Sequence, residues 1–347
     1  MVCANPAPAR FVFLNYVSRI AAMTVTICIP AYRSGHLVID TVRSVLRQTY
    51  GDFSVLVAID PSDEDPSAST ETLLRQHIDD SRIDIVVNER RLGWSQNVDR
   101  LLRRVRSDYF AILPHDDLWS KTYLATLIDI LERHPEHDVA YCDLIRFGAA
   151  RPTRKALILP PGEDRMQHLL RFFIQGARAM PWRGVTRTRS LARTSGFPSD
   201  DHKGFAVESE YALSLLTSGP AYHLASPLYF KRIHAPDVLS ASRDRVRNVA
   251  PPELRLAWQA HARRMRHLLD AHLSARMFRD ADCALYRAAL DGAMINRYQL
   301  TIGRRLAPEI LPMLTAAIAT AAGAAHPLAS DLSDRLAVYL QRHAAIA

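Results

Sequence analysis

The chain has 347 residues, of which 48% are hydrophobic and 23% charged, an ordinary balance for a globular protein. No run reaches the roughly 18 uncharged apolar residues of a membrane-spanning helix, and no basic run interleaved with aromatic side chains indicates nucleic-acid binding. The net charge of +8 fits an anionic partner, either a phosphorylated ligand or an acidic membrane surface.

The N-terminus and the cysteines bear on the compartment. The 4 cysteines are widely scattered and form no C-x-x-C pair, so we expect a reducing, cytoplasmic environment without disulfides. Arg19 interrupts the best apolar candidate for a secretory signal. Because Met23 directly precedes the first convincing strand, we interpret residues 1–22 as a leader that is disordered or untranslated.

Strand and helix patterns alternate from residue 24 to about residue 147. Short apolar runs predict the strands, and helical spacing of apolar residues predicts the helices between them. The predicted strands are residues 25–30, 53–60, 83–87, 109–113 and 139–145. The predicted helices are residues 36–48, 70–77, 93–103 and 124–133. This order indicates a mostly parallel sheet with helices on both faces.

The second half of the chain has a different texture. After a polar crossover, the predicted elements are an amphipathic segment at residues 166–174, a helix near 208–216 and a strand near 222–230. Beyond Pro252 the chain is rich in Ala, Leu and Arg with helical spacing. We therefore predict one α/β domain at residues 23–248 and a helical region at residues 249–347.

The segment YFAILPHDD at residues 109–117 carries the strongest indication of chemistry. An apolar run that reads as a buried strand ends in a proline, His115 and two adjacent carboxylates, Asp116 and Asp117. In open α/β sheets, ligands bind beyond the carboxyl ends of the strands. Hard oxygen ligands at that place suit a divalent cation that carries a phosphate-bearing substrate. The alternative is that Asp117 only caps a following helix.

Four segments resemble family 2 of the glycosyltransferases, inverting enzymes with the GT-A fold. VTICIPAY at residues 25–32 is similar to the family's V-S-I-I-I-P-x-Y-N, and SVLRQTY at residues 44–50 is close to S-V-L-x-Q-T-Y. Residues 59–65 correspond to the D-D-G-S-x-D segment and retain one carboxylate of its pair, Asp60. Residues 91–97 match N-x-G-x-x-x-x-N.

The resemblance extends over about residues 25–242 and implies a fold and a donor. The fold would be GT-A, a Rossmann-like, mostly parallel sheet flanked by helices, with an all-helical C-terminal appendage. The donor would be a nucleotide-sugar, by default a UDP-sugar, bound by Pro30, Tyr32, Asp60 and Asn97. The residues alone also allow a turn-capping role for Asp60 and a capping or packing role for Asn97.

The metal motif departs from the family pattern at Pro114, which stands where L-D-x-D-D has its first aspartate and cannot bind a metal. The resemblance then implies Asp117 as the principal ligand of Mn²⁺ or Mg²⁺, with His115 beside it and Asp116 nearer the ribose or behind the ligands. A histidine ligand would favour Mn²⁺. His234, in a segment similar to R-x-H…S, would complete the metal sphere or grip the diphosphate.

The catalytic base is implied by a helix further along the chain. Aligning LSLLTSG at residues 213–219 with the family's L-x-L-x-x-x-G places Glu208 at the general base, with Glu210 as the fallback. A carboxylate at a helix start is also favoured by the helix dipole alone. The resemblance further implies that Arg232 or Lys231 adds positive charge at the diphosphate.

These expectations combine into an inverting glycosyltransferase. It would transfer a sugar from the nucleotide-sugar to a hydroxyl acceptor in polysaccharide or glycoconjugate synthesis, by metal-assisted in-line displacement. The acceptor stays open between a saccharide, a lipid-linked saccharide and a protein. The C-terminal helices would hold the enzyme at the inner membrane face or form a homodimer.

Two other classes stay open. A nucleotidyltransferase would need a Gly-rich basic loop after the first strand, where this chain has AYRSG at residues 31–35. A catalytically degenerate GT-A protein would bind a nucleotide-sugar or a partner protein without transfer. Pro114, Ile59 and Ser209, each at a familiar carboxylate position, point to that second alternative.

Overall fold

The computed structural model describes residues 24–63, 65–149, 151–199, 205–234, 251–275, 279–298, 301–302, 305–306 and 310–344. The predicted leader at residues 1–22 and the predicted boundary at residue 248 lie outside these ranges.

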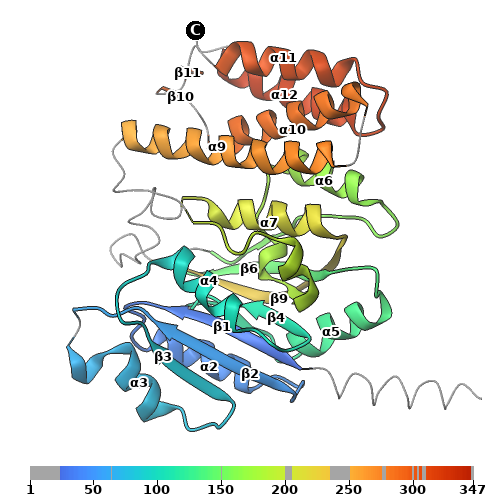
Figure 1. Ribbon diagram of the computed structural model, residues 1–347. Helices are drawn as coiled ribbons and strands as arrows, with labels where there is room; N and C mark the ends of the chain where they lie inside the picture. The colour runs from blue at the N-terminus through green and yellow to red at the C-terminus, as the bar shows by residue number, and fades with distance from the viewer. Residues whose placement is uncertain are drawn as a thin grey trace, which may run out of the picture.

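Four parallel strands form the first half of a 9-stranded sheet (Figure 1). They lie in the order β3-β2-β1-β4 and are β1 (Val25–Ala31), β2 (Phe53–Ile59), β3 (Ile83–Val87) and β4 (Tyr109–Ile112). They are connected through α2 (Leu37–Leu46), η1 (Pro66–Ala68), α3 (Thr70–His77) and α4 (Trp94–Arg104). Every residue of β1 and β4 is buried, which explains their continuous apolar sequence, because a central parallel strand is covered on both faces.

The remaining strands extend the sheet beyond β4, in the order β8-β6-β9-β5. They are β5 (Leu118–Trp119), β6 (Val139–Gly148), β7 (Thr153–Lys155), β8 (Val185–Arg187) and β9 (Ala221–Ile233). β6 and β9 pair in parallel, whereas β5, β7 and β8 pair antiparallel with their neighbours. The sheet is therefore mixed and mostly parallel, as predicted, and its three short antiparallel strands are additions to the prediction.

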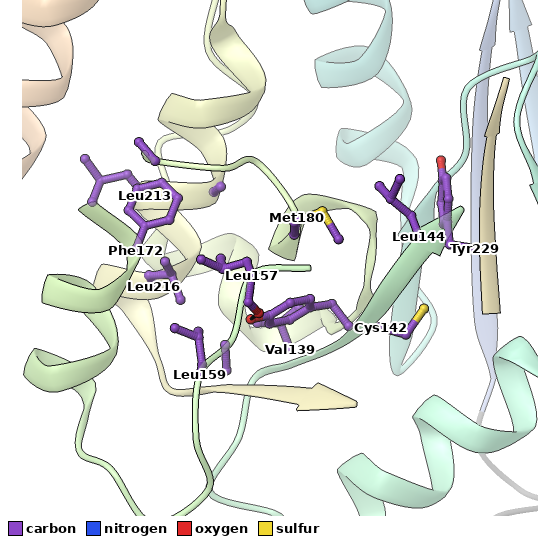
Figure 2. Close-up of a cluster of buried hydrophobic side chains, with 14 of the residues drawn as sticks. Val139, Cys142, Leu144, Leu157, Leu159, Phe172, Met180, Leu213, Leu216 and Tyr229 are labelled. Carbon is purple, nitrogen blue, oxygen red and sulfur yellow. Dashed lines mark hydrogen bonds between the residues drawn. The ribbon is translucent and has the colours of Figure 1, made fainter. Parts of the chain in front are cut away.

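Helices cover the sheet and bury a core against it. They are α5 (Tyr123–Arg133), α6 (Arg165–Ile174), η2 (Pro181–Arg183), η3 (Thr188–Arg193) and α7 (Val207–Ser218). Figure 2 shows Phe172 of α6 and Leu213 and Leu216 of α7 gathered with Leu157 and Val139, all of them buried. This packing fixes α7, which carries both candidate bases.

The C-terminal region consists of α9 (Pro251–Ser274), α10 (Asp280–Tyr298), α11 (Ile310–Ala322) and α12 (Ala329–Ala344). A short antiparallel pair of strands, β10 (Thr301–Ile302) and β11 (Arg305–Leu306), interrupts the predicted helical run. Figure 1 shows α7 between the sheet and α9. One hydrophobic cluster includes residues of the sheet, α7, α9 and α10, so the C-terminal helices share the main core. Among the described residues, no helix combines the length and apolar character needed to cross a membrane.

We predict that Leu213→Ala lowers the free energy of unfolding by about 2–5 kcal/mol, because it leaves a cavity in the core beneath α7. Urea denaturation followed by circular dichroism measures the change. The matched control is Ile158→Ala, whose side chain is 55% exposed and whose loss should shift stability by no more than about 0.5 kcal/mol. Equal effects of the two substitutions would contradict this account of the core.

Candidate active site

The candidate site lies at the topological switch point of the sheet, where the order of the strands changes direction beside β1. β1 pairs with β2 on one side and with β4 on the other, so a crevice is expected beyond the carboxyl ends of β1 and β4. The chain after β4 carries His115, Asp116 and Asp117 to this edge, next to Pro30 of β1. His115 Nδ1 lies 3.3 Å from the backbone oxygen of Pro30. The predicted metal motif and the predicted Pro30 turn therefore meet here.

Asp117 is buried and fully engaged by the protein. The Tyr229 hydroxyl donates to Asp117 Oδ2 at 2.7 Å, and the Arg232 backbone N–H donates to Oδ1 at 2.9 Å. Burial, aided by the charge of Asp116, raises the pKa of Asp117 to about 6. Since each of its carboxylate oxygens already accepts a hydrogen bond, Asp117 is better suited to joining β9 to the end of β4 than to holding a cation.

Asp116 and His234 form the second pair at this edge. His234 Nε2 lies 2.7 Å from Asp116 Oδ2. Burial acts to raise the pKa of Asp116, but the His234 hydrogen bond and the charges of His115, His234 and Lys231 outweigh it and hold the pKa at about 2. Asp116 is therefore ionised at neutral pH. The geometry favours Asp116 with His234, in place of the predicted Asp117, as the pair that could hold a cation.

Among the described residues, this edge holds no complete metal cage made by the protein alone. In the part of the chain that the structure describes, three potential ligand atoms converge within 4.8 Å only at His134, Glu136 and His137. Those residues lie in the turn before β6, at the opposite edge of the sheet. A cation held by Asp116 and His234 would therefore need oxygens from a substrate, and diphosphate oxygens are suitable donors.

Two cationic side chains, Arg183 and Lys231, accompany the acidic residues at this edge. Together with Asp116, Asp117 and His234 they form what we call the charged cluster. Arg183, in η2, has its Nε 3.9 Å from Asp117 Oδ2 and its guanidinium 4.2 Å from the Trp182 ring centre. The charge of Arg183, together with burial, lowers the pKa of Lys231, although Asp117, Glu208 and Asp116 oppose the shift. Sequence reasoning missed Arg183, which comes from a single turn without periodicity.

Arg232 does not face this cluster. Its Nε donates to the backbone oxygen of Asp116 at 3.0 Å, and its guanidinium lies 3.6 Å from Asp40 and over the Phe147 ring. Successive side chains of a strand point to opposite faces, so Lys231 shares a face with Tyr229 and Arg232 points away. The geometry therefore favours Lys231 over Arg232 for contact with a diphosphate.

The two candidate bases of α7 face different surroundings. Glu208 is half-buried in the first turn and lies near enough to Lys231 to influence its pKa. Glu210 is buried against α9, where His261 Nδ1 lies 2.6 Å and Arg264 Nε 2.9–3.0 Å from its carboxylate oxygens. Of the two, the geometry favours Glu208 as the base.

Asp60 stabilises the loop that precedes α4. Its Oδ1 accepts from Asn88 Nδ2 at 2.8 Å and from the Leu92 backbone N–H at 3.1 Å, and its Oδ2 accepts from the Gly93 backbone N–H at 2.7 Å. Asn97 Oδ1 accepts from the same Asn88 side chain at 3.1 Å. Both Asp60 and Asn97 are buried, which favours the turn-capping and packing roles left open by the sequence.

Tyr32 offers a flat surface next to this loop. It follows β1 and is half-buried, and the guanidinium of Arg91 lies 4.1 Å from its ring centre. An aromatic ring and an arginine plane are groups on which a base can stack. Tyr32 with Arg91 is therefore a more accessible candidate for base contact than Asp60 or Asn97.

The sheet defines the class as an open α/β protein, and the charged cluster at its switch point is chemically suited to an anionic ligand. The family model "Glycosyl transferase family 2" matches residues 26–197. This segment, just under half of the chain, is therefore similar to glycosyl transferase family 2.

The curated relatives align over part of the chain only. The UDP-Glc:alpha-D-GlcNAc-diphosphoundecaprenol beta-1,3-glucosyltransferase WfgD of Escherichia coli is 30% identical over 107 residues, 31% of this chain and 40% of WfgD. The amylovoran biosynthesis glycosyltransferase AmsB of Erwinia amylovora is 26% identical over 108 residues, 31% of this chain and 36% of AmsB. The alignments with curated relatives span 13% to 41% of their lengths.

The solved structure of S. aureus TarS 1-349 in complex with UDP-GlcNAc superimposes with a TM-score of 0.64 at 14% identity and covers 92% of both chains. At that identity the likeness concerns the fold, and it confirms the predicted GT-A architecture with C-terminal helices.

We predict that Asp60→Asn lowers the free energy of unfolding by roughly 1–3 kcal/mol. The new amide nitrogen would face N–H groups that now donate hydrogen bonds to a carboxylate oxygen. Differential scanning calorimetry measures the change. The control is Asp63→Asn, which alters an exposed carboxylate paired with Arg33 at the surface. If Asp60→Asn weakened UDP binding without lowering stability, Asp60 would be a ligand contact and not a loop support.

Proposed function

We propose that the protein is an inverting glycosyltransferase that moves a sugar from a nucleotide-sugar to a hydroxyl acceptor. The observation that carries this proposal is the charged cluster beyond β4. There Lys231 lies within electrostatic range of Asp116 and Glu208, and Arg183 lies near Asp117, so that two cations suited to a diphosphate accompany the Asp116–His234 pair. The family match of residues 26–197 supports the same reaction class.

A UDP-sugar is the donor that we favour. The structural neighbour TarS is described in complex with UDP-GlcNAc, and the relative WfgD is named for UDP-Glc. Tyr32 and Arg91 would contact the base beyond β1, and the diphosphate would lie towards Lys231 and Arg183. The acceptor would be a saccharide, a lipid-linked saccharide or a protein, and the names of WfgD and AmsB favour polysaccharide or glycoconjugate synthesis.

The mechanism follows from where the charges lie. Glu208 would take the proton of the acceptor hydroxyl while the acceptor oxygen forms a bond to the anomeric carbon. The bond from that carbon to the diphosphate oxygen breaks, and the nucleoside diphosphate leaves with the electron pair. Lys231 and Arg183 would stabilise the negative charge that develops on the leaving group. Because attack and departure occur on opposite sides, the configuration inverts.

A divalent cation fits the pair Asp116 and His234, whose carboxylate and imidazole suit Mn²⁺ or Mg²⁺, with the histidine favouring Mn²⁺. When bound, such an ion would act as a Lewis acid on the diphosphate. We further propose a cytoplasmic location, in which the C-terminal helices form a homodimer or attach the protein to the inner membrane face.

The alternative proposal is a degenerate GT-A protein that binds a nucleotide-sugar without transfer. Pro114 in the metal motif and the hydrogen bonds that occupy both Asp117 oxygens favour this alternative. The experiment that separates the two is incubation of the wild-type protein with UDP-sugars and Mn²⁺, followed by detection of released UDP.

We predict that Glu208→Gln lowers kcat by about 10²–10⁴-fold while UDP affinity stays within about twofold, because the amide cannot accept the proton. Coupled detection of released UDP measures turnover, and calorimetry measures UDP binding. Glu71→Gln on the surface of α3 is the matched control and should leave both unchanged. Retained turnover in Glu208→Gln would remove Glu208 from the mechanism.

We also predict that Mn²⁺ strengthens UDP binding at least about tenfold, and that EDTA or Asp116→Asn abolishes this gain. Isothermal titration of UDP, with and without Mn²⁺, measures it. Asp117→Asn is the informative comparison, because it should lower thermal stability while some metal dependence remains. Loss of metal dependence in Asp117→Asn alone, with Asp116→Asn unaffected, would return Asp117 to the position of principal ligand.

A further inference from the structure

Buried charged side chains connect the C-terminal helices to α7, the helix that carries the candidate base. Glu210, two residues after Glu208, is met by His261 and Arg264 of α9. The side chains of His261 and Glu210 are 0% and 2% exposed. Arg264 approaches both carboxylate oxygens, with Nε at 3.0 and 2.9 Å. Such a shared, two-oxygen contact restrains the orientation of a carboxylate more than a single hydrogen bond does.

The start of α7 has no side-chain cap. Its N-cap residue, Ala206, has the left-handed φ of 56° and makes no side-chain capping hydrogen bond. A helix start without a cap forgoes a stabilising interaction at its first turn. Phe205, which precedes it, lies edge-on to the His261 ring with 6.1 Å between ring centres. The contacts that hold this turn therefore come in part from α9.

Helix geometry couples these contacts to Glu208. Residues two apart on a helix point about 200° apart, since each residue turns the helix by roughly 100°. Glu210 contacts α9, so Glu208 points away from α9, and the two residues share one turn of backbone. A displacement of that turn moves both side chains.

We propose that Glu210, His261 and Arg264 form a clamp through which the C-terminal helices position Glu208 for proton transfer. Its catalytic part rests on the proposed glycosyltransferase function. The three residues are positioning residues, because the clamp acts on Glu208 through the backbone of α7. The clamp gives the C-terminal helices a role in turnover that does not require them to bind the donor.

The test compares Arg264→Met, Arg264→Lys and Arg263→Met in the full chain. Arg263 is exposed on the same helix and serves as the matched control. Hydrogen exchange followed by mass spectrometry reports on the first turn of α7 without any need for turnover. We expect exchange there to accelerate about tenfold in Arg264→Met, to return towards wild type in Arg264→Lys and to stay unchanged in Arg263→Met. The peptides of β1 and β4 should exchange as in the wild type.

Kinetics then test the link to Glu208. Arg264→Met should lower kcat at least about tenfold with the donor KM unchanged, and it should add little to Glu208→Ala when the two are combined. Unchanged α7 exchange, acceleration spread equally over the sheet, or additive losses in the double variant would each overturn the clamp. If the wild type transfers no sugar, the proposed function fails, whereas the exchange data still decide whether α9 holds the first turn of α7.

Discussion

The arrangement of the site depends on one buried carboxylate. Asp117 ends the segment that follows β4 and accepts hydrogen bonds from the side chain of Tyr229 and the backbone of Arg232 on β9. The next two residues form β5, which pairs with β9, so the ladder and the carboxylate fix the same register. Lys231 lies between Tyr229 and Arg232 on β9, so the hydrogen bonds of Asp117 and the pairing of β5 with β9 both restrain its position. A buried carboxylate without hydrogen-bond partners would lower the stability of the fold, and this cost keeps Asp117 bonded to β9.

Much of the fold is readable from local pattern, and the exceptions have a physical reason. β1 and β4 are buried on both faces, so their apolar runs identify them without any knowledge of their neighbours. β5 and β8 have two and three residues, too few to display a period. They are strands only because β9 and β4 lie next to them, a tertiary fact that the sequence does not display.

The residues of the candidate site also divide into those that the sequence predicts and those that depend on tertiary structure. Motif spacing predicts that His115, Asp116 and His234 meet at one edge of the sheet, and the structure places His234 2.7 Å from Asp116 after β4. Which aspartate meets His234 depends on the turn after β4 and on the pairing of β5 with β9, and spacing along the chain contains neither. Asp60 was open between ligand contact and loop support because its donors are mainly backbone N–H groups, which look the same in every sequence. Arg183 follows from no pattern, since a single 3-10 turn delivers it.

The family match and the charged cluster do not coincide along the chain. Residues 26–197 contain Asp116, Asp117 and Arg183, whereas Glu208, Lys231 and His234 lie beyond them. The matched segment therefore contributes one part of the cluster, and the candidate base and the remaining charges come from α7, β9 and the residue after β9. α7 belongs to a hydrophobic cluster that continues into α9 and α10. In physical terms the C-terminal helices extend the core that supports the candidate base, so a change in their packing can reach the site without altering any residue in it.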